Sequence, residues 1–413
     1  MRYNLGYMDK YPIEATGTVI ENNPMYKVTL KTPVNPILLE SSLLKAIKDY
    51  PLFGTKVMYD KEYYLETNTN PLIITKAKEE DRPLTFGKNT NGYTWQVCYF
   101  DNILTFEWLH GTTDGVGAMN FILRVLMYYF DCPTEIANKS YLVAPGLEPF
   151  FDTKEKGIDF KNDPEGFSFK KFKKKYTGYT TDCHLLKADT KELLALSNTA
   201  ESSVAPIIAI LFSKAIRMHL PSNMKNRKVA CNIVLDLRRS LGYDTMHNCV
   251  EYKRITYDDH FDSMSFREVA KEYKRKLDDA RLTPNIIKIV TDRIKLFKSY
   301  HITRNKHLLK GIVKLIGLVL KDRDCNFVIT YPGKIDLPKA FIDQVEDLEL
   351  KLWHDFGECI IACMDYNGTF NLNISENFYE KGIVEDFIKL SENYGIHWKE
   401  VSCTPFTQAH FVE

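Results

Sequence analysis

Residues 103–115 read ILTFEWLHGTTDG, and the fold is best inferred outward from this stretch. The apolar run 103–109 is typical of a strand, and the apolar periodicity of residues 119–126 is typical of a helix. His110 therefore stands in a turn at the end of a strand. Because imidazole titrates near neutral pH and can both take and return a proton, a histidine on such a rigid support suits a general base.

The residues after the histidine shape the turn. Asp114 is placed to cap the following helix, so we expect its carboxylate to orient the loop rather than contact a substrate. Gly115 lets the backbone bend or lets a substrate atom approach closely. The same residues also fit a purely structural interpretation, because Asp-Gly is a common turn pair and a strand-end histidine is often satisfied by its neighbours.

Length and charge set the broad class. A chain of 413 residues predicts two domains, which we place at 1–175, ending in a crossover, and at 176–413. The hydrophobic content of 44% is ordinary for a globular protein. With 55 basic and 54 acidic residues the net charge is +1, so no global field attracts nucleic acid or an anionic membrane. We expect small-molecule partners and no nucleic acid.

Cysteine usage bears on compartment and metal binding. The nine cysteines are scattered and no apolar leader follows Met1, which predicts reduced thiols in a cytoplasmic protein. Cys359 and Cys363 have no second pair or histidine at ligand spacing, so no metal site is expected. The apolar run 315–320 is too short to span a bilayer, and we expect no membrane span.

Strands and helices alternate along both halves of the chain. The predicted elements are a strand at 25–30, a helix at 38–50, a hairpin of strands 92–100 and 103–109 about Asp101-Asn102, strands at 184–188, 228–238 and 326–331, a helix at 204–218 capped by Ser203, three amphipathic helices between 265 and 320, a hairpin about Asn367-Gly368 and a last helix at 382–394. A basic run, 170–175, falls in the crossover; it is either a solvated linker or a contact for substrate phosphates.

In this order the elements resemble the coenzyme A-dependent acyltransferase superfamily, which includes chloramphenicol acetyltransferase, BAHD and alcohol acyltransferases, and condensation domains. The family's His-x-x-x-Asp-Gly motif corresponds to residues 110–115. Residues 234–238 with Asn248 are similar to the family's Asp-Leu-Arg strand and the Asn-rich turn after it. Residues 327–333 resemble the strand that ends in Ser-Asn-x-Gly in many relatives. The resemblance covers nearly the whole chain.

The resemblance implies an α/β (α+β) fold of two chloramphenicol acetyltransferase-like subdomains, each a mixed sheet with flanking helices, with an active-site tunnel between them. It implies acyl transfer from acyl-coenzyme A, a cosubstrate and not a bound cofactor, to an alcohol or amine. His110 would be the general base, and Asp114 would point away from substrate and pair with Arg238. Backbone amides near Gly115 or the Thr330 hydroxyl would receive the oxyanion, and Asn248 is a further candidate for substrate contact.

Three departures from the family pattern refine this expectation. Leu109 stands where many relatives have a second histidine, which leans away from a peptide-forming condensation domain. Thr330-Tyr331 replaces the Ser-Asn pair. Residues 355–357 read Asp-Phe-Gly like a BAHD motif, but Glu358-Cys359 follows, and we give that match no weight.

Three alternatives stay open from the sequence. One is a condensation enzyme that takes its acyl group from an acyl carrier protein. A second is a non-catalytic relative that binds a partner or small molecule, and the third is an unrelated two-domain fold. The sequence leaves the acceptor and the acyl chain length unassigned.

Overall fold

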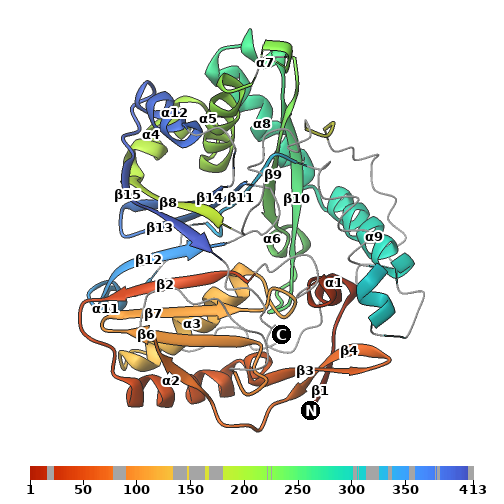
Figure 1. Ribbon diagram of the computed structural model, residues 1–413, viewed down its shortest axis with the longest axis vertical. Coiled ribbons are helices and arrows are strands. Elements are labelled where there is room, and N and C mark those ends of the chain that lie inside the picture. The colour runs from red at the N-terminus through yellow and green to blue at the C-terminus, as the bar shows by residue number, and fades with distance from the viewer. Residues whose placement is uncertain are drawn as a thin grey trace.

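The computed structural model describes residues 1–15, 23–77, 90–133, 147, 163–166, 180–220, 222–224, 226–300, 305, 307–312, 325–333, 337–352, 359–376, 378 and 382–407. Within these residues the strands form one sheet of three, one of five and one of seven strands. The five- and seven-stranded sheets lie in the two halves of the molecule, with helices against each (Figure 1).

The five-stranded sheet carries the histidine motif. Its order is β12 (Val345–Lys351), β2 (Met25–Leu30), β7 (Ile103–Trp108), β6 (Trp95–Phe100) and β5 (Ile74–Lys76), with only β5 and β6 parallel. Helices α2 (Pro36–Asp49) and α3 (Gly115–Tyr129) lie beside it in Figure 1. The three-stranded sheet, β1 (Arg2–Asn4), β4 (Glu62–Thr67) and β3 (Thr55–Asp60), adjoins it, and α1 (Tyr7–Ala15) follows β1.

The seven-stranded sheet belongs to the C-terminal half. Its order is β10 (Val250–Tyr257), β9 (Val229–Asp236), β11 (Phe327–Thr330), β13 (Cys359–Tyr366), β14 (Thr369–Glu376), β8 (Thr180–Asp189) and β15 (Lys399–Thr407), with β11 parallel to both neighbours. The main helices of this half are α4 (Thr190–Thr199), α5 (Val204–Met218), α8 (Phe266–Ala280), α9 (Thr283–Tyr300) and α12 (Ile383–Glu392), with short helices α6 (Arg238–Leu241) and α7 (Asp259–Asp262). The short helix α11 (Lys339–Ile342) precedes β12, and its Phe341 belongs to the N-terminal core.

Local chemistry explains most of these boundaries. Asn35 caps α2 by accepting from two backbone amides, and Pro36 starts the helix because proline needs no amide donor there. Asn367 and Gly368 both have positive φ (49° and 84°), which is the geometry of a tight hairpin turn. The predicted hairpins, β6–β7 and β13–β14, are confirmed.

Each half buries its own apolar core. The N-terminal core is rich in aromatic rings, with Phe53 stacked on Phe121 at a centroid distance of 4.0 Å. The C-terminal core lies between α5 and the seven-stranded sheet and contains Phe212, Phe327 and Phe387. The α/β prediction is confirmed. The boundary predicted after residue 175 lies outside the described residues, and β12 joins the N-terminal sheet from late in the sequence.

Several elements differ from the sequence prediction. The strand predicted to reach 238 ends at Asp236, and Arg238 opens α6 instead, because the chain turns there toward β10. Ser203 precedes α5, but its side chain makes no cap hydrogen bond. Helix α1 and strands β12 and β15 were not predicted. Residues 170–175, 315–320 and 355–357 lie outside the described residues.

All nine cysteines are among the described residues and none forms a disulfide. In the described part of the chain no single helix has the length and apolar character needed to cross a membrane; α4 and α5 would meet that test only as a pair, and the chain bends by 89° between them.

Candidate active site

The turn that carries His110 is tied to its own strand. The indole nitrogen of Trp108 donates to the Thr113 carbonyl oxygen at 3.2 Å. Thr112 donates two hydrogen bonds to the Leu109 carbonyl oxygen, one from its amide at 2.9 Å and one from its hydroxyl at 2.8 Å. These short-range bonds set the turn between β7 and α3, so the half-buried His110 side chain stands on a rigid support.

Two glycines in and after the turn are required by close contacts. A Cβ on Gly111 would lie 2.3 Å from Ile13 Cγ1 and 2.9 Å from the Asp9 carbonyl oxygen, which shows how closely α1 approaches the turn. A Cβ on Gly117 would lie 2.1 Å from Thr113 Oγ1 and 2.7 Å from the Met246 carbonyl oxygen. At Gly115, the first residue of α3, a Cβ would meet only the Tyr26 hydroxyl at 3.4 Å, an ordinary contact.

His110 is held by a residue from the other half of the molecule. Asn248, which precedes β10, lies with Oδ1 3.1 Å from His110 Nδ1. The amide nitrogen of the same side chain donates to the His110 carbonyl at 2.8 Å and to Asp9 Oδ1 at 3.0 Å. Both of these partners only accept, so the orientation of the Asn248 amide is settled by its surroundings.

This orientation determines which tautomer the neutral imidazole adopts. Because Asn248 presents an oxygen to Nδ1, His110 must carry its proton on Nδ1 and donate it. Nε2 is then the unprotonated, basic nitrogen. Among the described residues no hydrogen bond to His110 Nε2 is present. The lone pair on Nε2 faces away from Asn248, which is the arrangement that a general base requires.

Asp9 completes this support, and sequence reasoning missed it. Its carboxylate is fully buried; Oδ1 accepts from the Asn248 amide nitrogens of backbone (3.2 Å) and side chain (3.0 Å). Oδ2 lies 3.2 Å from His247 Nδ1 and 3.3 Å from the Gly6 amide. No pattern in the sequence relates residue 9 to residue 248, because α1 reaches the turn only through tertiary packing.

Asp114 serves the turn and not the imidazole. Its Oδ1 accepts from the Gly117 amide at 3.0 Å, which caps α3, and its Oδ2 accepts from the Cys249 amide at 2.8 Å. Arg238 Nη2 lies 2.9 Å from Oδ2 and 3.0 Å from Oδ1. With 1% of its surface exposed, the carboxylate joins the two halves of the molecule through one buried ion pair.

Arg238 is fully committed to this junction. Besides Asp114 it donates to the carbonyl oxygens of Thr245 and His247, both at 3.0 Å, and to Asp236 Oδ1 at 2.9 Å. Burial by itself would lower the pKa of Arg238, but the adjacent Asp114 carboxylate outweighs it and the pKa is raised. The guanidinium therefore stays charged at any physiological pH.

Tyr26 of β2 holds the first residue of α3 by a hydrogen bond. Its hydroxyl donates to the Gly115 carbonyl at 2.9 Å, and its ring stacks on Trp108 with centroids 5.1 Å apart. Burial, together with the nearby Asp114 charge, raises the pKa of Tyr26. The phenol therefore remains a hydrogen-bond donor.

Thr330 lies on the strand next to β9. It is the last residue of β11, which runs parallel to β9 and pairs Ile329 with Ile233. The C-terminal end of β11 therefore lies on the same side of the sheet as the C-terminal end of β9. Arg238 follows β9 on this side, and Asn248 lies just before β10 there. Within the described residues no hydrogen bond links Thr330 to His110. The structure brings together His110, Asn248, Asp114 and Arg238, and the role of Thr330 stays a prediction.

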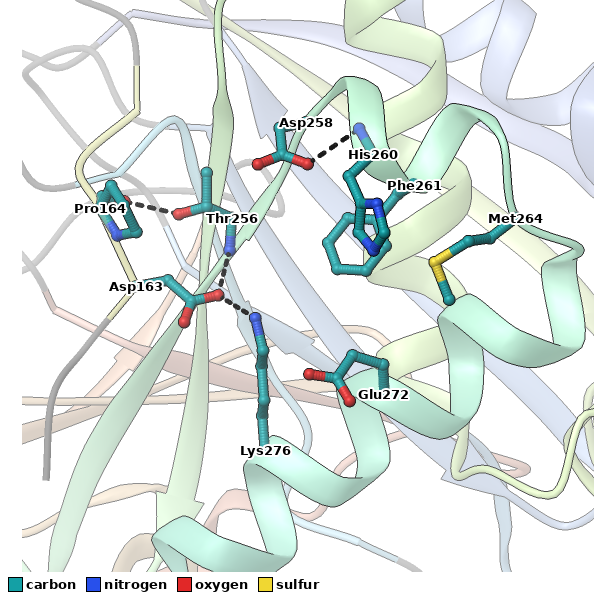
Figure 2. Close-up of a pocket in the computed structure, with 9 residues that line it drawn as sticks. All are labelled: Asp163, Pro164, Thr256, Asp258, His260, Phe261, Met264, Glu272 and Lys276. Atoms are coloured by element: carbon teal, nitrogen blue, oxygen red, sulfur yellow. Dashed lines mark hydrogen bonds and ion pairs between the residues drawn. The ribbon is translucent and has the colours of Figure 1, made fainter.

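A different cavity, of about 440 Å³, lies at the far end of β10 (Figure 2). Asp163 and Lys276 form an ion pair in its wall at 2.5 Å, and the Thr256 amide donates to the same carboxylate at 3.1 Å. Thr256 is eight residues beyond Asn248 along an extended strand, which places this cavity roughly 27 Å from the His110 site. It therefore belongs to another part of the molecule.

Cys359 and Cys363, the pair considered for a metal, are both buried in β13. Burial raises the pKa of each thiol, which disfavours the thiolate that a metal requires. Neither belongs to the cluster of potential metal ligands found among the described residues, which consists of His184, Glu400 and Cys403.

Known structures share this architecture over nearly the whole length of this chain. TRI101 of F. sporotrichioides, solved with coenzyme A and T-2, is 12% identical with a TM-score of 0.66, covering 97% of this chain and 100% of that one. The trichothecene 15-O-acetyltransferase TRI3 of Fusarium sporotrichioides is 12% identical with a TM-score of 0.58, covering 95% and 94%. The nonribosomal peptide synthetase FmoA3 is 10% identical with a TM-score of 0.63, covering 96% of this chain and 42% of that one.

No family model and no curated protein matches the sequence. At identities of 10–12% the likeness is one of fold. The fold is the one that the sequence predicted, and it is shared by a 15-O-acetyltransferase, by a protein solved with coenzyme A and by a nonribosomal peptide synthetase.

Proposed function

We propose that this chain transfers an acyl group from an acyl-coenzyme A thioester to the hydroxyl or amine of a small molecule, with His110 as general base. The observation that carries the proposal is the hydrogen bond between His110 Nδ1 and Asn248 Oδ1. Asn248 keeps the proton on Nδ1, and the basic Nε2 is left for substrate on a half-buried side chain at the junction of the two halves.

The proposed reaction needs no covalent intermediate on the protein. His110 Nε2 takes the proton of the acceptor as its oxygen or nitrogen attacks the thioester carbonyl. The tetrahedral oxyanion collapses, the carbon–sulfur bond breaks, and the imidazolium returns the proton to the thiolate of coenzyme A. A positioned base of this kind contributes roughly 10²–10⁴-fold to the rate.

The other site residues receive separate tasks in this proposal. Asp114 and Arg238 hold the turn against the second half, since both carboxylate oxygens and all three guanidinium nitrogens are already engaged. Asn248 and Asp9 orient the imidazole. For the oxyanion we retain the predicted donors, the backbone amides near Gly115 or the Thr330 hydroxyl.

The donor identity has one specific competitor. The likeness to FmoA3 supports a condensation enzyme whose acyl group arrives on a carrier protein. We favour coenzyme A as the donor, because TRI101, whose match covers 97% of this chain and 100% of its own, was solved with coenzyme A bound. Leu109 in place of a second histidine points the same way.

The test is a thiol-release assay on the purified full chain. Short- and long-chain acyl-coenzyme A donors are screened against a panel of alcohols and amines, and in parallel against the same acyl groups on a carrier protein. We expect acceptor-dependent release of free coenzyme A, reduced at least about 10²-fold in His110→Ala. Normal turnover by that variant would overturn the assignment of His110. Turnover with carrier-bound acyl groups alone would favour the condensation enzyme, and none with either donor would favour a non-catalytic relative.

A further inference from the structure

A second cluster of reactive side chains lies at the opposite edge of the seven-stranded sheet. His184 of β8, Glu376 of β14, and Glu400 and Cys403 of β15 converge there. His184 Nδ1 is 2.7 Å from Glu400 Oε1, while Nε2 is 3.7 Å from Glu376 Oε1 and 3.9 Å from Cys403 Sγ. The histidine and Glu376 are buried, while Cys403 is exposed, so an ion can enter from solvent.

The strand register shows that these side chains share one face. His184 pairs with Ile374 on one side and with Cys403 on the other, and Leu186 pairs with Glu400. Directly opposed residues point to the same side of a sheet, as do residues two apart on one strand. His184, Glu376, Glu400 and Cys403 therefore all project from the face on which Leu186 and Ile374 pack into the C-terminal core.

A β-bulge makes this arrangement possible. Glu400 and Cys403 are three residues apart, so a regular strand would send their side chains to opposite faces. The register shifts between Glu400 and Ser402, and Val401 is the extra residue. This single insertion aims both side chains at His184. Bulges commonly re-aim a side chain in this way next to functional sites.

Two of the three ligand separations suit a tetrahedral zinc ion, and binding would draw the Glu376 carboxylate toward Cys403. With Zn–N of about 2.0–2.1 Å, Zn–O of about 2.0–2.2 Å and Zn–S of about 2.3 Å, neighbouring ligand atoms lie roughly 3.3–3.8 Å apart. The separations of His184 Nε2 from Glu376 Oε1 (3.7 Å) and from Cys403 Sγ (3.9 Å) are close to these values. The Glu400 carboxylate on Nδ1 is the usual partner that orients a metal-binding histidine.

We propose that this cluster is a zinc site, in which His184 Nε2, Cys403 Sγ and Glu376 bind the ion and Glu400 orients the imidazole. Water would take the fourth position. A thiolate, an imidazole and a carboxylate form a ligand set that Zn²⁺ accepts. Binding releases the proton of the Cys403 thiol to solvent, so no redox step is involved.

The site would clamp the C-terminal strand. In the described sheet β15 is an edge strand paired only with β8, and the ligands come from three adjacent strands. Asn248 lies just before β10, the strand at the opposite edge. Six strand spacings of about 4.8 Å separate the two edges, roughly 29 Å, so the zinc site is independent of the acyl-transfer proposal.

The test uses the full chain, reduced and stripped of metal, titrated with Zn²⁺ in competition with a chromogenic chelator. We expect one Zn²⁺ per chain, with affinity at least tenfold lower in Cys403→Ser, His184→Gln and Glu376→Gln. Glu400→Gln should weaken binding by about 10–100-fold, as loss of an orienting partner does. The matched control is Cys183→Ser, because Cys183 neighbours His184 on the opposite face of β8 and should leave the affinity unchanged.

Titration with Co²⁺ gives a second readout. A Co²⁺–thiolate absorption band should appear in the parent chain and in Cys183→Ser and be missing in Cys403→Ser, whose exposed position leaves folding intact. A protonated His184 held between two carboxylates, without a metal site, would give no such band and equal Zn²⁺ affinity in all variants. Either of these results would overturn the proposal.

Discussion

Oδ1 of Asn248 lies 3.1 Å from Nδ1 of His110, although 138 residues separate the two in the sequence. This contact joins the N-terminal half, which carries the histidine, to the C-terminal half. Because the Asn248 amide nitrogen is held by two acceptors, its oxygen is the only group available to the imidazole. One side chain from the second half thus decides which nitrogen of His110 is basic.

Replacing Asn248 should therefore impair the chemical step. In Asn248→Ala the imidazole loses its partner on Nδ1 and distributes its proton over both nitrogens. We expect kcat to fall by about 10²-fold with little change in KM, since a misplaced proton removes part of what a positioned base contributes. Nitrogen NMR of the His110 ring should show Nδ1-protonated imidazole in the parent chain and a mixture in the variant. An unchanged tautomer and kcat would contradict the prediction.

Asp9 should affect the same chemical step through Asn248, whose side-chain amide it binds. Asp9→Ala removes the acceptor of the Asn248 amide and leaves buried donors unpaired, at a cost of about 1–3 kcal/mol in the free energy of unfolding. With the amide released, kcat should also fall. Asp9→Asn keeps one acceptor oxygen and should recover part of kcat. If Asp9→Ala loses stability but keeps the kcat and the His110 tautomer of the parent chain, the prediction is contradicted and Asp9 is purely structural.

The buried ion pair predicts a large stability effect. Arg238→Ala leaves the Asp114 carboxylate buried and uncompensated, and breaking such a pair typically costs about 3–5 kcal/mol. The control is Arg275→Ala on α8, whose guanidinium side chain is 59% exposed and pairs with Glu272 and Asp279. That change should cost no more than about 1 kcal/mol. Urea denaturation of both variants measures the difference, and equal losses would argue against the junction.

Two glycines of the turn should respond differently to alanine. Gly117→Ala places a methyl group 2.1 Å from Thr113 Oγ1, so the turn must shift and stability should fall by about 1–3 kcal/mol. Gly115→Ala meets only the Tyr26 hydroxyl at 3.4 Å and should leave the melting temperature nearly unchanged. If Gly115→Ala nevertheless loses activity, a substrate atom approaches that position, as the sequence suggested. A stable Gly117→Ala would contradict the close packing.

Lys253 predicts a pH dependence of stability. Burial lowers the pKa of this β10 lysine to about 8. Between about pH 8 and its ordinary value near 10.4, the unfolded chain then binds more protons at Lys253 than the folded chain does. The contribution of this residue to the free energy of unfolding therefore rises with pH across that window. The free energy of unfolding of the parent chain minus that of Lys253→Met should increase from pH 8 to pH 10. A difference that stays constant over this range would contradict the prediction.

The fold was predictable because its signals are local. The strand before His110, the Asp114 cap and the Asn-Gly hairpin each depend on residues within a few positions of one another. Strands β12 and β15 were not predicted, since their partners lie far away in the sequence: β12 pairs with β2 and β15 with β8. Helix α1 was also missed, and with it Asp9.

The candidate site divides in the same way. His110 and Asp114 are recognisable from their spacing, and Arg238 from the resemblance of residues 234–238 to the family's Asp-Leu-Arg strand. Asn248 was named as a candidate for substrate contact, whereas the structure shows its side chain engaged by His110 and Asp9. Its orientation depends on a carboxylate from α1, which no local pattern reveals.

By itself, the sequence determined the alternation of strands and helices and the histidine motif, because periodicity, caps and turns act between near neighbours. Only the tertiary structure decided which nitrogen of His110 is basic, which carboxylate orients Asn248, and that a bulge in β15 aims Glu400 and Cys403 at His184. These are properties of groups brought together by burial from distant parts of the chain. Their hydrogen bonds exist only once both halves have packed.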